Sequence, residues 1–102
     1  MNRSTRDEAS GWPEYERVCS LLRQCECDVY RLAVSGRVPQ TPGVPDQITF
    51  SPLRGHAYVQ VKHSTARETQ TQKRFHSLCD QHGIIYLLGG VEVVRDWLGR
   101  PA

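Results

Sequence analysis

Apolar residues recur along this chain with two different periods, which separate predicted helices from predicted strands. Over residues 14–24 and just beyond, the apolar positions follow the i, i+3, i+4, i+7 spacing of one helix face, at Val18, Leu21, Leu22 and Cys25. Pro13 suits the first turn of this helix, where its missing N–H is not needed. Residues 27–33 alternate instead and are rich in β-formers, so they predict a strand.

Two more predicted strands, residues 47–50 and 57–62, flank a polar turn that contains the Pro and Gly such a turn favours. They follow a Gly/Pro/Ser-rich loop over residues 35–42 and a tight turn that ends at Asp46. Because side chains alternate along a strand, Gln60 and Lys62 point to the same face. An acid, an amide and a lysine can therefore converge on one point, which would suit a divalent metal ion and a phosphate.

The C-terminal third predicts a helix, a buried strand and a short final helix. Thr65 and Glu68 fit a capping box, with Glu three residues after a Thr N-cap, and Gly83 suits the residue that follows the helix. The apolar run 84–88 predicts a buried strand, and residues 91–98 predict the last helix. The expected inward positions are Gln72, Phe75, Leu78, Cys79 and His82 in the first of these helices, and Val91, Val94, Trp97 and Leu98 in the second.

The predicted order is therefore α-β-β-β-α-β-α. A helix between the third and fourth strands implies a right-handed crossover, so we expect these two strands to be parallel in a mixed sheet. With 102 residues the chain is long enough for one modest core. We expect a disordered polar tail over residues 1–11 and a single domain over 12–102.

The net charge of +2 hides a basic middle. Residues 31–74 carry seven basic side chains against two acidic ones, a balance of +5, which favours a polyanionic partner. An ordinary solvated basic face is the alternative. No apolar run approaches membrane-spanning length and no leader-like segment opens the chain, so we expect no membrane partner. The four cysteines fit neither a zinc ribbon nor a disulfide scaffold, and reduced thiols in the cytoplasm are the favoured interpretation.

This order of elements, with Gly-Val-Pro-Asp (43–46) before the second strand and Gln-Val-Lys (60–62) ending the third, resembles the PD-(D/E)XK nuclease superfamily. Downstream, residues 69–98 are similar to its VRR-NUC group. The resemblance covers about residues 12–99. It implies an α/β fold, an αβββαβ(α) restriction-endonuclease-like core with a central mixed sheet flanked by helices. It also implies a Mg²⁺- or Mn²⁺-dependent deoxyribonuclease that hydrolyses phosphodiester bonds as an endonuclease.

The resemblance assigns roles residue by residue. Asp46 matches the metal-binding aspartate, Gln60 occupies the place usually held by Glu, and the Val61 backbone carbonyl would join them on the metal. Lys62 matches the lysine that orients water or neutralises charge on the phosphoryl oxygens. The departure is Gln60, because a neutral amide oxygen is a legitimate but weaker ligand than a carboxylate for a hard cation.

Two further candidates keep alternative interpretations. Glu14 resembles the group's first-helix acid and would reach the metal, but an acid at a helix start can also stabilise the helix dipole. Gln72 matches the glutamine beside the active site, but a half-buried amide can also tie a helix to the sheet. A zinc site from Cys25, Cys27 and His82 has the wrong spacing.

A small basic domain without a separate recognition module favours DNA read by shape and phosphate position. We therefore expect a structure-selective, nicking endonuclease for branched or junction DNA, acting as a homodimer in a bacterial or phage-infected cell. The alternatives are a catalytically inactive DNA-binding member of the same fold and a protein-interaction domain that binds an acidic partner. The side chains expected to track the DNA backbone are Arg31, Arg37, Arg67, Lys73 and Arg74.

Overall fold

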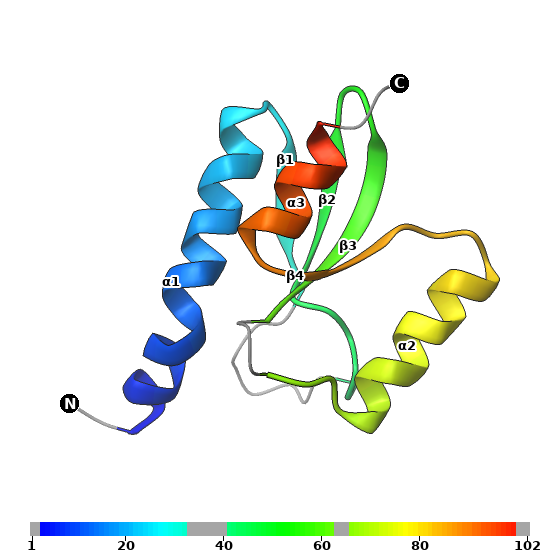
Figure 1. Ribbon diagram of the computed structural model, residues 1–102. Helices are drawn as coiled ribbons and strands as arrows, with labels where there is room; N and C mark the ends of the chain where they lie inside the picture. The colour runs from blue at the N-terminus through cyan, green and yellow to red at the C-terminus, as the bar shows by residue number, and fades with distance from the viewer. Residues whose placement is uncertain (1–2, 33–40, 63–65, 100–102) are drawn as a thin grey trace.

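A four-stranded sheet in the order β1-β2-β3-β4 forms the centre of the molecule (Figure 1). The computed structural model describes residues 3–32, 41–62 and 66–99. The first three strands pair antiparallel, whereas β3 and β4 are parallel, as the predicted crossover requires. The mixed sheet confirms the predicted α/β class. The strands are β1 (Asp28–Arg31), β2 (Gln47–Ser51), β3 (Gly55–Val61) and β4 (Tyr86–Gly89).

Three helices complete the predicted order: α1 (Arg3–Gln24), α2 (Gln70–Gln81) and α3 (Val91–Leu98). The last helix has the predicted bounds, with Val94 and Trp97 fully buried. None of the helices in the described ranges has the length and apolar character needed to cross a membrane.

The two faces of the sheet are covered differently. The face that we call the core face carries Thr49, Ala57, Val59 and Leu87, all buried, and it packs against α1 and α3, which contribute Val18, Leu22, Val94 and Trp97. Burying these side chains is the main driving force for the fold, because each fully buried Val or Leu contributes about 1.5–3 kcal/mol.

The opposite face, which we call the site face, is covered by α2 only over β3 and β4. Phe75 of α2 packs edge-on against Tyr58 with ring centroids 5.1 Å apart and lies 6.1 Å from Tyr86. Alternation along the strands places Ile48, Phe50 and Gln60 on this same face. Figure 1 shows α2 standing apart from β1 and β2, so among the described residues no helix lies over that half of the site face.

The first helix begins earlier than predicted. It runs from Arg3, through the segment that was expected to be a disordered tail, and Pro13 lies inside it rather than in its first turn. Four of the seven residues 3–9 are Arg, Glu or Ala, which favour helix. Pro13 removes one backbone hydrogen bond but does not end the helix.

The predicted inward position of Cys25 is wrong. The helix ends at Gln24, and Glu26 adopts a left-handed conformation with φ of 63°. This turn carries Cys25 off the helix face and leaves it exposed, while Cys19 and Cys27 are buried. Of the predicted strand 27–33, Asp28–Arg31 is a strand. Residues 33–40, which hold most of the predicted loop 35–42, lie outside the described residues.

The N-cap of α2 is Thr69 and not the predicted Thr65. The Thr69 hydroxyl accepts from the Gln72 backbone N–H at 3.2 Å, and the Gln72 side chain accepts from the Thr69 N–H at 2.9 Å. Both Thr residues have a Glu or Gln three positions on, so the motif alone could not choose between them. Gly83 follows the helix with φ of 69°, as predicted.

Two of the expected inward positions of α2 are also wrong, because this helix covers only half of a sheet face. Cys79 is buried and Phe75 half-buried, but Leu78 and His82 are exposed. Because the contact of α2 with the sheet is narrow, it buries Cys79 and part of Phe75 but not the neighbouring positions.

Replacement of the true cap tests this boundary. We expect Thr69→Ala to lower the free energy of unfolding by about 1 kcal/mol, the usual cost of losing a Thr cap. Thr69→Ser is the matched control and should change it by a few tenths at most, because serine keeps the hydroxyl that accepts from the Gln72 N–H. Denaturant unfolding measures both, and an equal loss in the two variants would contradict the assignment.

Candidate active site

Asp46 is held at the start of β2 by the turn before it. Gly43 adopts φ of 94°, and a Cβ there would collide with the Thr71 backbone carbonyl at the N-terminus of α2. Glycine is therefore required for both its conformation and its lack of a side chain. The Asp46 carbonyl accepts from the Leu32 N–H at 2.8 Å, which fixes the turn to the end of β1.

The Asp46 carboxylate joins the end of β3. Its Oδ2 accepts hydrogen bonds from the Val61 backbone N–H at 2.9 Å and from the Gln60 side-chain amide at 3.2 Å. Burial raises the pKa of Asp46, while the Val61 N–H and the charges of Lys62 and Arg31 act against that rise. The ionised form therefore depends on these neighbours.

Gln60 leaves one polar atom unsatisfied. The residue is 5% exposed, and within the described structure its Oε1 is buried without a hydrogen-bond partner. A buried carbonyl oxygen in this state costs about 1–3 kcal/mol unless something compensates it. The same amide group contacts the Asp46 carboxylate through its N–H, so a hard cation bound between the two side chains would satisfy the amide oxygen and the carboxylate together.

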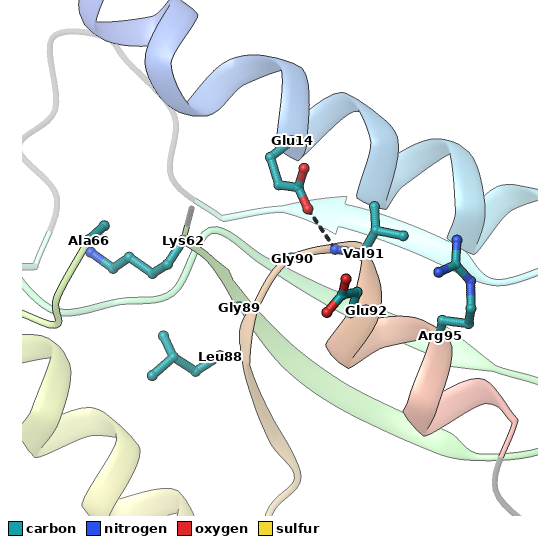
Figure 2. A pocket seen from close by; sticks show the side chains of 9 residues that line it. All are labelled: Glu14, Lys62, Ala66, Leu88, Gly89, Gly90, Val91, Glu92 and Arg95. Carbon is teal, nitrogen blue, oxygen red and sulfur yellow. Dashed lines mark hydrogen bonds between the residues drawn. The ribbon is translucent and has the colours of Figure 1, made fainter. Parts of the chain in front are cut away.

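Lys62 lies just beyond β3 and lines an open cleft of about 680 Å³. Its backbone N–H donates to the Gly89 carbonyl at 2.9 Å, which continues the pairing of β3 with β4. In Figure 2 its side chain runs along one side of the cleft toward Ala66, while Glu14 of α1 lies across from it. The cleft thus sits at the carboxyl ends of the two parallel strands, where α/β folds commonly bind ligands.

Glu14 caps α3, a contact that the sequence did not predict. Its Oε2 accepts from the Val91 backbone N–H at 2.8 Å, the bond drawn dashed in Figure 2, and its Oε1 pairs with Arg17 at 3.2 Å. The N-cap residue of α3 is Gly90, which has no side chain to do this. A Cβ on Gly90 would collide with the Glu14 carboxylate. The sequence signal for this contact is the Gly-Gly pair (89–90) before α3, because a helix without a capping side chain of its own needs a cap from elsewhere.

Gln72 has a structural role in the capping box of α2, where its side chain accepts from the Thr69 N–H. Gln72 is not among the residues that line the cleft, and neither are Asp46, Gln60 and Val61. A role toward phosphate stays a prediction.

Of the five predicted DNA-contacting side chains, the four that the structure describes are divided between β1 and the start of α2. Arg31 lies over the Tyr15 ring of α1, 5.4 Å from its centroid, on the β1 edge. Arg37 falls outside the described residues. Arg67, Lys73 and Arg74 are exposed at and before the first turns of α2.

Among the described residues no three His, Cys, Asp or Glu side chains gather closely enough to hold a metal. The donors at the Asp46 site are instead one carboxylate, one amide oxygen and a backbone carbonyl, from Asp46, Gln60 and Val61. All are hard oxygen ligands of the kind that Mg²⁺ takes, so the residues fit the ion that the fold family implies.

Comparison with known proteins supports the fold. No family model matches the chain, and neither does any curated protein. A solved structure described as a VRR_NUC domain superposes with a TM-score of 0.72 at 18% sequence identity, covering 90% of this chain and 97% of that one. The predicted restriction-endonuclease-like fold is therefore confirmed, and the resemblance to VRR-NUC domains holds at the level of the fold.

The contact between Glu14 and Gly90 can be tested by substitution. We expect Gly90→Ala to displace the carboxylate, leave the Val91 N–H unpaired and lower the free energy of unfolding by about 1–3 kcal/mol. Glu14→Gln, which keeps an acceptor, should cost less than Glu14→Ala.

Gly99→Ala is the control for the glycine substitution, because φ there is −89° and a Cβ would lie 3.3 Å from the nearest atom, the Arg95 carbonyl oxygen. Thermal unfolding compares the variants. A Gly90→Ala protein as stable as Gly99→Ala would contradict this account of the cap.

Proposed function

We propose, from the premise that this chain has the fold of a VRR-NUC domain, that it is a metal-dependent endonuclease that hydrolyses phosphodiester bonds in DNA. The observation that supports the proposal is the buried, unsatisfied amide oxygen of Gln60, a residue whose amide N–H donates to the Asp46 carboxylate. The fold and the set of oxygen ligands both favour metal-dependent hydrolysis of phosphodiester bonds.

Asp46, the Gln60 amide oxygen and the Val61 carbonyl would hold a Mg²⁺ or Mn²⁺ ion. Such an ion, when bound, polarises the phosphate and lowers the pKa of water. Glu14 faces the same cleft as Lys62 and would contribute a second carboxylate if its bond to Val91 opens.

The chain's own residues supply the electrostatics. The Lys62 ammonium neutralises charge that develops on the phosphoryl oxygens, or orients the attacking water. The same positive charge, with the Val61 N–H, favours the ionised form of Asp46 against the pKa rise caused by burial. Lys62 thus acts both on Asp46, a proposed metal ligand, and on the phosphate of the substrate.

Gln60 has a physical advantage over the usual Glu in the metal-free protein. Its amide N–H donates to Asp46 at 3.2 Å, whereas a carboxylate could not donate and would repel its neighbour. The exchange lowers the charge available to a cation. We therefore expect a site that is stable when empty and needs more metal than a Glu site would.

The proposed substrate is branched or junction DNA, nicked by a homodimer in the cytoplasm of a bacterial or phage-infected cell. Exposed Arg67, Lys73 and Arg74 around the start of α2 support contact with phosphates. A member that binds DNA without cleaving it is the second candidate, because Gln60 removes one carboxylate from the site.

Loss of Lys62 or Asp46 tests catalysis. We expect Lys62→Ala and Asp46→Ala each to reduce Mg²⁺- or Mn²⁺-dependent nicking by at least about 100-fold, the usual cost of removing one group that stabilises the transition state. Nicking of supercoiled plasmid and of a four-way junction measures it.

Arg23→Ala is the control for that assay, because Arg23 is exposed in the last turn of α1 and lies outside the cleft. It should keep full activity. Wild-type protein that binds DNA but cleaves no substrate with either metal would favour the non-catalytic candidate, and unchanged activity in Lys62→Ala would contradict the assigned role.

Gln60→Glu tests the metal ligand without measuring activity. Without metal, the lost hydrogen bond and the added charge should lower the free energy of unfolding by about 1–3 kcal/mol. Mn²⁺ should then raise the unfolding midpoint more in this variant than in wild type, because tighter binding to the folded state stabilises it more.

Gln47→Glu is the matched control, since Gln47 is a fully buried glutamine on the core face, where it contacts Cys19. It should be destabilised without recovering in Mn²⁺. The same metal-dependent shift in both variants would argue against a metal ligand at Gln60.

A further inference from the structure

Three aromatic rings lie exposed on the site face, one on each of the neighbouring strands β1, β2 and β3. Tyr30 of β1 is 60% exposed and Phe50 of β2 is 44% exposed, and His56 of β3 is exposed beside them. Phe50 meets Tyr30 edge-to-face with centroids 6.0 Å apart, and lies 6.2 Å from the His56 ring at 37° to its plane. We call these three residues the ring row.

The ring row lies on the same face as the proposed active site, with the Ile48–Tyr58 pair between them. Along β2, Phe50 lies four residues after Asp46, and along β3, His56 lies four residues before Gln60. At ~3.3 Å per residue both separations are about 13 Å. Even spacing keeps all four side chains on the same face of the sheet. The row therefore lies within reach of an extended polymer that is bound at the proposed site.

The chemistry of the row suits nucleobases better than phosphates. None of its members is Lys or Arg, and the cross-strand partner of Phe50 is the exposed acid Asp28, which would repel a phosphate. Aromatic faces stack on any base, and the Tyr hydroxyl and His nitrogens add hydrogen-bonding tips. A positively charged side chain, that of Lys62, lies at the other end of the face, beside the proposed site. The ring row would therefore bind the bases of a nucleotide chain, and Lys62 would bind its phosphate backbone.

We propose that the ring row binds unpaired bases of the DNA on which the proposed site acts. The inference rests on the proposed function, and it names the substrate more closely: DNA with an unpaired segment next to the scissile phosphate, such as a flap, a gap or a splayed junction arm. In a fully paired duplex the base faces are stacked on one another and are not available to the rings.

Binding measurements on the full chain separate bases from phosphates. Fluorescence anisotropy in EDTA would compare a labelled single-stranded oligonucleotide, a flapped duplex and a blunt duplex. We expect Tyr30→Ala and Phe50→Ala each to weaken binding of the first two by about 5- to 150-fold, and binding of the blunt duplex by less than twofold. The salt dependence should not change, because no phosphate contact is lost.

Conservative and matched variants distinguish the loss of base contacts from the loss of the folded structure. Tyr30→Phe and Phe50→Tyr keep a ring and should keep the affinity for single strands. Leu53→Ala removes a different exposed apolar side chain, 83% exposed in the turn between β2 and β3, and should have no effect. Equal losses on single-stranded and blunt DNA, or no loss on either, would overturn the proposal.

A second copy of the chain is the competing occupant of this face. Light scattering at the concentrations used for binding would show it: a dimer that Phe50→Ala converts to a monomer would overturn the proposal. Failure of the two proposals is distinguishable. Cleavage without a ring-row effect leaves the endonuclease intact, and a ring-row effect without cleavage leaves the base-binding surface intact.

Discussion

The hydrogen bonds that the Asp46 carboxylate accepts from Val61 and Gln60 fix the geometry on which the site depends. They join the start of β2 to the end of β3 across the hairpin, so the acid and the amide keep their positions as long as the strands stay paired. The same bonds hold the carboxylate in a half-buried position, where burial raises its pKa. The site therefore carries an electrostatic cost that the fold supports and that a bound cation would relieve.

Glycines complete this arrangement where side chains must approach the backbone. Gly43 lets the turn before Asp46 lie against the N-terminus of α2, and Gly90 makes room for the Glu14 carboxylate at the N-terminus of α3. The first contact joins the turn before β2 to α2, and the second joins the start of α3 to α1. The cleft that holds Lys62 is thus bounded by elements from three separate parts of the chain.

Periodicity predicted the order of elements, the parallel β3–β4 pair and the last helix, because each follows from local spacing and chain connectivity. It also placed Asp46, Gln60 and Lys62 near one another, since a hairpin allows few other arrangements. It could not choose between Thr65 and Thr69 as the cap of α2, where the motif occurs twice. Nor could it predict that Glu14 caps α3, because that contact joins residues 77 positions apart and depends on how two helices pack.

The proposed chemistry requires Asp46 and the Gln60 oxygen to bind a divalent cation together. Crystals soaked in Mn²⁺ would locate that ion, because the anomalous difference map shows its position without assuming its ligands. We expect a peak within coordination distance of an Asp46 carboxylate oxygen, Gln60 Oε1 and the Val61 carbonyl, absent in Asp46→Ala. Well-ordered crystals with no peak there, or with a peak that persists in Asp46→Ala, would contradict it.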